Sequence, residues 1–302
     1  MEAYFGPLSF FALIVAGKIL SDTGFFQKFY QDVLIKLVLN ITVPCAAISA
    51  FGDVQGDSCL LWVAVIGFFC AVIPLLAARW ATAGYSAPRR AFYLVSMSGS
   101  SLGCFMLPLL QNFWGSAGAV LVCVFDVGNA IMTTGGSYAL TACFLHTEKN
   151  MGVSAVMKRF FRSVAVDTYL VLLLCIALEI RIPQVILELV RPAADANAFL
   201  SMLMVGMMIR LPRRDQWPDV LKLLLGRLAL AVVFSALIRA FAPFPPETRT
   251  ILALIPFAPI GVLAPVYVDA CGGDRELASF ANSASVLLSL FITSALCILL
   301  LR

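Results

Sequence analysis

Charged residues and histidine are scarce in this sequence, and their scarcity excludes several classes of protein. Asp, Glu, Lys and Arg make up 13% of the 302 residues, against 61% for hydrophobic residues. Soluble domains carry about 25% charged residues, so the composition predicts a membrane protein. The sequence has a single histidine, His146, which disfavours both a histidine metal site and a Ser-His-Asp triad. The chain also lacks a GxxxxGK[ST] loop, which disfavours an ATP-driven pump.

Other absences narrow the function further. The nine cysteines form no CxxC pair and lie mostly in apolar runs, so we expect small, reduced core residues. We predict no metal, no cofactor and no enzymatic activity. The basic residues are spread over several loops, so the net charge of +4 does not indicate nucleic-acid binding. No basic region precedes the first apolar run, which is therefore expected to remain as a membrane helix.

Long apolar runs are abundant. A membrane-spanning helix needs about 20 apolar residues, and ten runs of roughly this length predict an all-α polytopic membrane protein with ten transmembrane helices. The predicted spans are residues 5–20, 31–51, 58–78, 91–112, 117–145, 160–180, 184–210, 218–241, 250–268 and 277–301. Of the Lys and Arg residues counted in connections and adjoining ends, fourteen fall in one alternate set and five in the other. Because basic residues gather on the cytoplasmic side, both termini are predicted outside the cell membrane.

Two predicted spans contain residues that interrupt a helix. The first, SMSGSSLGCFMLP at 96–108, contains two glycines and a proline, and the second, IPFAPIGVLAP at 255–265, contains three prolines and a glycine. Proline removes a helical hydrogen bond and glycine loosens the backbone, so both helices should break. Lipid cannot satisfy the freed peptide groups, and broken membrane helices are typical of transporter binding sites.

The second half of the sequence repeats the layout of the first. Adding 157 to positions in the first half takes Asn40 to Asn197 and Pro108 to Pro265. Each half has five predicted helices, and this odd number places the halves in opposite orientations. The sequence therefore predicts two inverted five-helix repeats whose broken helices, the fourth and the ninth, cross near the middle of the membrane.

Three stretches resemble the auxin efflux carrier family. They are LIKLVLNITVP in helix 2, SLGCFMLPLL followed by WGSAG in helix 4, and APIGVLAPVYVDACGGDRELASFANSASVLLSL in helices 9 and 10. Their order and spacing fit a bacterial-type member without a long central loop. The chain departs from the family pattern at Ser101, where helix 4 usually has asparagine, and at Leu263, a position in helix 9 that is often polar.

The resemblance implies an arrangement and a substrate. It implies a scaffold of residues 1–51 and 160–210, which also forms a homodimer, and a transport part of residues 58–145 and 216–302. Members of the family look like carriers of small carboxylates such as indole-acetate, malate and malonate. We therefore expect a secondary active or facilitative transporter of a small organic anion that uses an elevator-type motion in the lipid bilayer.

Residues at the two breaks are the candidates for binding the substrate. Backbone N–H groups at the start of a half-helix hold carboxylates without a buried cation, and serine hydroxyls add donors. The candidate substrate residues are Ser98, Ser100, Ser101, Gly103, Pro108, Asn129, Pro259, Gly261 and Pro265. The candidate coupling or supporting residues are Asp126, Lys36, Asn40 and Asn197.

Asp126 has three open roles. A carboxylate at depth costs at least about 2.5–3.5 kcal/mol, so it should be paired, hydrated or protonated. It can carry a coupling proton with Asn129 as its partner, brace the break in helix 4, or bind a cation. Arg191 and Asp195 are four residues apart and predict a local ion pair in the scaffold.

Two alternative functions remain open on the sequence. Within transporters, the alternative is a sodium-coupled organic-anion symporter of the bile-acid type, which would need oxygen ligands at both breaks. From another class, the alternative is a channel or a transporter-like sensor. A channel favours rings of charged pore residues, which are not evident in the sequence.

Overall fold

The computed structural model describes residues 2–25, 28–52, 60–146, 153–210 and 216–300, and these residues form helices joined by turns, with one isolated β-bridge. Five of the described helices are long and apolar enough to cross a membrane. A bent pair, Ser154–Phe160 with Val164–Ala177, makes six if it counts as one span. The predicted all-α class is confirmed, and several helices have the length and composition of membrane spans.

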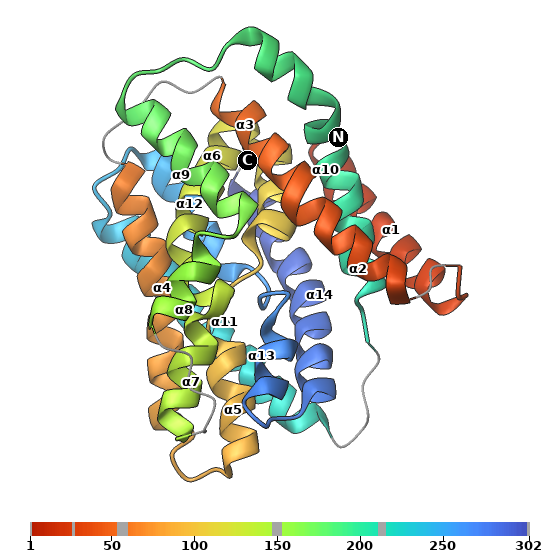
Figure 1. The fold of residues 1–302 in the computed structure, drawn as a ribbon, viewed down its shortest axis with the longest axis vertical. Coiled ribbons are helices and arrows are strands. Elements are labelled where there is room, and N and C mark those ends of the chain that lie inside the picture. The colour runs from red at the N-terminus through yellow and green to blue at the C-terminus, as the bar shows by residue number, and fades with distance from the viewer. Residues whose placement is uncertain (1, 26–27, 53–59, 147–152, 211–215, 301–302) are drawn as a thin grey trace.

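Figure 1 shows how the helices are arranged. The first half contains α1 (Glu2–Asp22), α2 (Lys28–Leu37), η1 (Val38–Thr42), α3 (Val43–Phe51), α4 (Leu60–Ala81), α5 (Ala87–Met97), η2 (Leu102–Met106), α6 (Leu107–Ile131), η3 (Met132–Gly136) and α7 (Ser137–Leu145). The second half contains α8 (Val153–Phe160), α9 (Val164–Ala177), α10 (Gln184–Met207), α11 (Trp217–Phe241), α12 (Pro246–Leu254), η5 (Ile255–Phe257), α13 (Ala264–Ala270) and α14 (Arg275–Leu300).

The predicted fifth span, 117–145, is not a regular α-helix throughout, because it includes the π-helical segment η3, which contains the glycine pair Gly135 and Gly136. The predicted sixth span, 160–180, corresponds to α9, and the chain bends by 76° between α8 and α9, at the start of that span. Between the predicted spans 91–112 and 117–145 the chain kinks at Gly115, where φ is 56°, a value that favours glycine.

Prolines explain two of the three π-helical segments. Pro44 and Pro108 each lie two residues after a π-helical segment, η1 and η2 respectively. A proline ring clashes with the carbonyl one turn earlier and has no N–H to donate, and a wider turn relieves the clash. Both helices thus continue past their proline. Pro108 therefore lies in a restarted helix, and the break in helix 4 lies before it.

Two helix pairs pack closely because each helix places a glycine against the backbone of the other. In the α4–α6 pair, a β-carbon on Gly67 would lie 2.1 Å from the Phe125 carbonyl oxygen, and one on Gly128 would lie 1.9 Å from the Ala64 carbonyl oxygen. The α1–α10 pair shows the same pattern, with Gly17 against the Leu203 carbonyl and Gly206 against the Ile14 carbonyl. In lipid no hydrophobic effect drives helices together, and small residues allow their backbones to approach closely.

The remaining contacts form two groups. Helices α3 and α9 join the α1–α10 pair, and α5, α7, α11, α12, α13 and α14 join the α4–α6 pair. The groups meet mainly where α3, α9 and α10 contact η2 and α6. They coincide with the residues expected to form scaffold and transport part, a division that stays a prediction.

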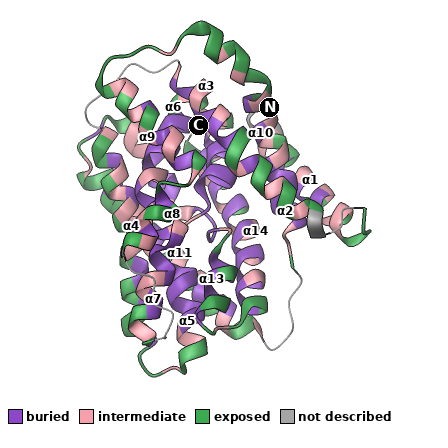
Figure 2. Cartoon of the chain, viewed as in Figure 1, coloured by how far each residue is buried: buried purple, intermediate pink, exposed green. Residues whose placement is uncertain are grey.

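The outer faces of the helices suit lipid. Large apolar side chains are exposed on α4, α10 and α11, among them Trp80 (82%), Leu189 (79%) and Phe241 (78%). Figure 2 shows buried residues concentrated on the inner helices and exposed ones on the periphery. Exposed apolar surface of this extent calls for an apolar environment.

At its lower end in Figure 1, α5 is joined to α11 by polar contacts. Arg89 forms an ion pair with Asp219, and the Tyr93 hydroxyl donates to the same carboxylate at 2.8 Å. The hydrogen bond with Asp219 raises the pKa of Arg89, which precedes the predicted fourth span. The contact fixes the first broken helix to a helix of the other half.

Gly128→Ala should destabilise the protein because its methyl group would meet the α4 backbone rather than a flexible side chain. Overpacking of this kind costs about 1–3 kcal/mol, so the apparent melting temperature in detergent should fall by several degrees. Gly84→Ala is the matched control, because a β-carbon there has no heavy atom within 4 Å. Equal melting temperatures for the two variants would contradict the close packing of α4 and α6.

Candidate functional site at the crossing of two interrupted helices

The first interruption occupies residues 98–101. Helix α5 ends at Met97, and Ser98 has extended backbone angles (φ −91°, ψ 147°). Gly99 has φ of 67°, and a β-carbon there would lie 2.7 Å from Thr133 Cγ2. The helix resumes at Leu102 after the extended Ser101. The predicted break is confirmed, and Gly99 is the residue that lets the chain turn there.

The second interruption occupies residues 258–263. Helix α12 ends at Leu254 and continues for one 3₁₀ turn, after which the chain is extended at Ala258. Helix α13 begins at Ala264, with Pro265 in its first turn, where a missing N–H costs nothing. This predicted break is also confirmed, and Pro265 starts the restarted helix.

The two interruptions lie against each other as a minimal antiparallel ladder. Ser100 and Ile260 form an isolated antiparallel β-bridge, and the Ser101 N–H donates to the Pro259 carbonyl at 2.9 Å. Each segment thus supplies hydrogen-bond partners for the other. This pairing meets the requirement that non-helical backbone at membrane depth be satisfied within the protein.

Side chains from the following helices complete the backbone hydrogen bonds. Asn129 Oδ1 accepts from the Ser100 N–H, and Asn129 Nδ2 donates to the Ser100 carbonyl, both at 2.9 Å. On the other segment, Ser285 Oγ accepts from the Ile260 N–H at 3.0 Å, and Ser289 Oγ donates to the Phe257 carbonyl at 2.6 Å. Asn129 therefore acts on the backbone of the break, although it was predicted to contact substrate.

Arg227 of α11 binds both interrupted helices at once. Its Nη1 donates to the Ser96 and Met97 carbonyls at 2.8 and 3.0 Å, the last carbonyls of α5. Its Nη2 donates to Ser100 Oγ at 3.0 Å and to the Ala258 carbonyl at 3.3 Å. The guanidinium fork of Arg227, which was not among the predicted site residues, thus holds the two interrupted helices together.

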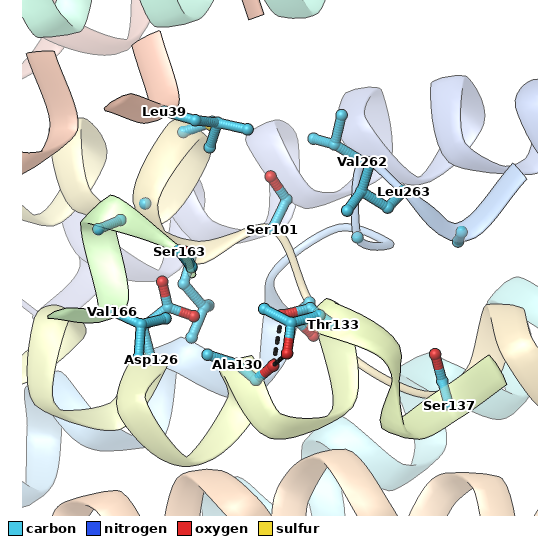
Figure 3. A pocket seen from close by; sticks show the side chains of 18 of the residues that line it. Leu39, Ser101, Asp126, Ala130, Thr133, Ser137, Ser163, Val166, Val262 and Leu263 are labelled. Atoms are coloured by element: carbon cyan, nitrogen blue, oxygen red, sulfur yellow. Dashed lines mark hydrogen bonds between the residues drawn. The ribbon is translucent and has the colours of Figure 1, made fainter. Parts of the chain in front are cut away.

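A cavity of about 140 Å³ borders the crossing, and Arg227 is not among the residues that line it. All three π-helical segments reach its wall, through Leu39 of η1, Leu102 of η2 and Thr133 of η3. Figure 3 shows Ser101, Asp126 and Thr133 around this space. The cavity is large enough for several waters or a small organic molecule.

The cavity wall is mainly apolar and holds one carboxylate. Asp126 Oδ1 accepts from Asn129 Nδ2 at 2.8 Å, and the Gly103 backbone N–H lies against the same carboxylate. Asp126 therefore braces the start of the resumed helix, in the manner of an N-terminal cap supplied by another helix. Among the described residues that line the cavity, Asp126 is the one with a formal charge.

Tyr169 of α9 brings an unused hydroxyl to this cavity. Its side chain is fully buried (0% exposed), and its Oη has no hydrogen-bond partner among the described residues. The Cys123 thiol lies beside it, but a thiol is a weak partner. A buried hydroxyl without a partner costs about 1–3 kcal/mol, so Tyr169 is a donor in need of an acceptor.

The predicted site residues separate into three sets. Those that line the cavity are Ser98, Ser100, Ser101, Gly103, Asp126 and Gly261. Those that shape the crossing from outside the cavity wall are Pro108, Asn129, Pro259 and Pro265. Those that lie away from the cavity wall are Lys36, Asn40 and Asn197.

The three supporting residues lie within the α1–α10 group. Lys36 and Asn40 are exposed, and Asn40 Nδ2 donates to the Lys36 carbonyl at 2.8 Å. Asn197 is buried, and its Oδ1 accepts from Thr42 Oγ1 at 2.9 Å, which joins α10 to η1. The ion pair between Arg191 and Asp195 is present at 3.9 Å, with both side chains exposed.

No model of a known protein family and no curated protein sequence matches the chain.

Arg227→Lys should loosen the crossing. Lysine keeps the charge, but its single ammonium cannot span carbonyls of both interrupted helices, so we expect a loss of about 2–4 kcal/mol in stability. Amide hydrogen exchange at residues 96–101 and 255–261 should accelerate together. Arg239→Lys, on the same helix with an exposed side chain, is the control and should change neither property. Exchange that accelerates in one segment alone would contradict the bridging role.

Proposed function

We propose that this chain is a ten-span secondary transporter that carries a small organic anion across the cell membrane by alternating access. One observation carries the proposal. Two helices, from opposite halves of the chain, are interrupted at the same place, pair with each other there, and border a cavity. Interrupted helices that meet beside a cavity are the arrangement expected of a transporter binding site.

Donors around the cavity favour an anion. Ser100 Oγ accepts a hydrogen bond from the Arg227 guanidinium, so the Ser100 O–H remains free to donate into the cavity. A hydroxyl polarised in this way is a stronger donor than an isolated one. Ser101 adds a second hydroxyl to the cavity wall, and the buried Tyr169 hydroxyl has no hydrogen-bond partner among the described residues. A carboxylate is an acceptor that can satisfy several donors together.

The contacts between helix groups support an elevator-type motion. Gly103 of η2 lies between Val43 of α3 and Tyr169 of α9. The substrate cavity is thus bordered by both helix groups, with the two interruptions on one side and α3 and α9 on the other. Movement of one group past the other would carry the cavity with the crossing.

Helix ends support the proposed orientation. At the lower end of Figure 1, α4 ends and α5 and α11 begin, whereas α9 ends and α10 begins at the upper end. The basic residues Arg89, Arg90 and Lys222 belong to the lower set. Positive residues gather on the cytoplasmic side, so we assign the lower end to the cytoplasm and both termini to the outside. Homodimerisation through α1, α2, α3, α9 and α10 is part of the proposal.

Transport into proteoliposomes tests the function directly. Labelled indole-acetate, malate and malonate, with sodium and proton gradients imposed separately, should give uptake of at least one carboxylate above protein-free vesicles. Uptake of organic cations in place of carboxylates would overturn the anion assignment. Uptake that grows without saturation would favour a channel.

Gly103→Ala should block transport while sparing the fold. A β-carbon at this position would lie 3.1 Å from Val43 Cγ1 and 3.2 Å from Tyr169 Oη. The added methyl group would narrow the cavity and hinder movement of η2 past α3 and α9. We expect initial uptake to fall at least about tenfold, since a misplacement of about 1 Å at a site has effects of that size or larger. Gly84→Ala serves as the control. Normal uptake by Gly103→Ala would contradict the placement of the substrate beside η2.

A further inference from the structure

The charge of the cavity does not match the charge of its proposed ligand. Asp126 contributes a negative charge, and the lining residues described include no lysine, arginine or histidine. Two cations contact residues of the cavity wall from outside it, Arg227 at Ser100 and Arg159 at the hydroxyl of Tyr267. An organic anion that enters this cavity therefore meets a carboxylate without a cation between them.

Among the described residues, no other group that faces Asp126 carries a positive charge. Asn129 Nδ2 and the Gly103 N–H donate to its carboxylate but are neutral. The remaining groups are the Cys104 thiol of η2, the Cys123 thiol of its own helix α6, and the Tyr169 hydroxyl of α9. Leu39 of η1, Val43 of α3 and the Val262 and Leu263 side chains of the second interruption are apolar. Two carboxylates that share such a site cannot both stay ionised at low cost.

Tyr169 and Asp126 face the same small volume. A methyl group placed on Gly103 would lie 3.2 Å from Tyr169 Oη and 3.7 Å from Asp126 Oδ2. One carboxyl group is thus within reach of both, accepting from the tyrosine with one oxygen and meeting Asp126 with the other. The unpaired Tyr169 hydroxyl gains its acceptor when such a ligand binds.

We propose that the cavity binds one small carboxylate together with one proton, with the ligand carboxylate between the Tyr169 hydroxyl and Asp126 and the proton held between the two carboxyl groups. This inference rests on the proposed function and adds its coupling. The proton comes from solvent, and no covalent bond forms or breaks apart from the bond to the proton. The ligand anion and the proton together add no net charge, so the site keeps the single negative charge of Asp126. Transport of a monocarboxylate is then electroneutral.

The affinity of the purified protein for the best-transported monocarboxylate, measured by equilibrium binding between pH 6.5 and 8.5, tests the inference. Free monocarboxylates stay ionised over this range. Binding of one proton per ligand makes the affinity tenfold tighter for each pH unit of acidification. Asp126→Asn should abolish this slope, because the amide supplies a donor at every pH. Tyr169→Phe should weaken binding at every pH and keep the slope, and Asp195→Asn, an exposed carboxylate, should match the wild type.

Several outcomes overturn the inference. They are a pH-independent affinity in the wild type, or a slope that survives in Asp126→Asn. Should Asp126→Asn fail to fold, proton uptake by the wild type on ligand addition in weak buffer decides, with one proton per ligand expected and none contradicting it. Carboxylate uptake with a flat pH profile removes the coupling alone. A folded protein that transports no carboxylate removes the proposed function, and the coupling with it.

Discussion

Peptide groups that leave a helix inside a membrane must find partners in the protein, and the crossing of the two interruptions depends on this constraint. A hydrogen bond contributes about 1 kcal/mol in net terms, but a buried group left without one costs about 1–3 kcal/mol. Here Ser101 and Pro259 satisfy each other, Asn129 serves both backbone groups of Ser100, and Ser285 serves Ile260. Neither interruption is complete without the other, so the two halves of the chain must fold together.

The same constraint explains where the charges lie. Arg227 and Asp126 do not contact each other directly, and hydrogen bonds connect them through Ser100 and Asn129. Charged groups at depth are costly and usually functional. Arg227 compensates carbonyl dipoles of both interruptions, while Asp126 stands at the start of a resumed helix. Each charge is in direct contact with neutral groups, and the hydrogen bonds through Ser100 and Asn129 connect it to the opposite charge.

Local signals made the interruptions predictable, whereas the residues that brace them depend on the fold. Pro259 and Gly99 disrupt a helix wherever the fold places them, so both breaks could be read from the sequence. Pro108 was assigned to the break itself, but prolines are also tolerated where a helix restarts, and a π-helical turn accommodates this one. Arg227 has a usable signal, because it is an arginine ten residues into an apolar helix, but it was not among the predicted site residues. Tyr169 had no such signal, because an aromatic residue in an apolar run is indistinguishable from a core residue.

The glycine pairs determine which helices can move relative to one another. Within α4–α6 and within α1–α10, one backbone rests on the other at two points, so a shift along either seam would drive carbonyls into Cα atoms. The contact between the two groups is different, since aliphatic side chains such as Val43, Leu39 and Val166 line the cavity there. A motion of the proposed kind would therefore follow this contact and leave the two glycine-packed helix pairs intact.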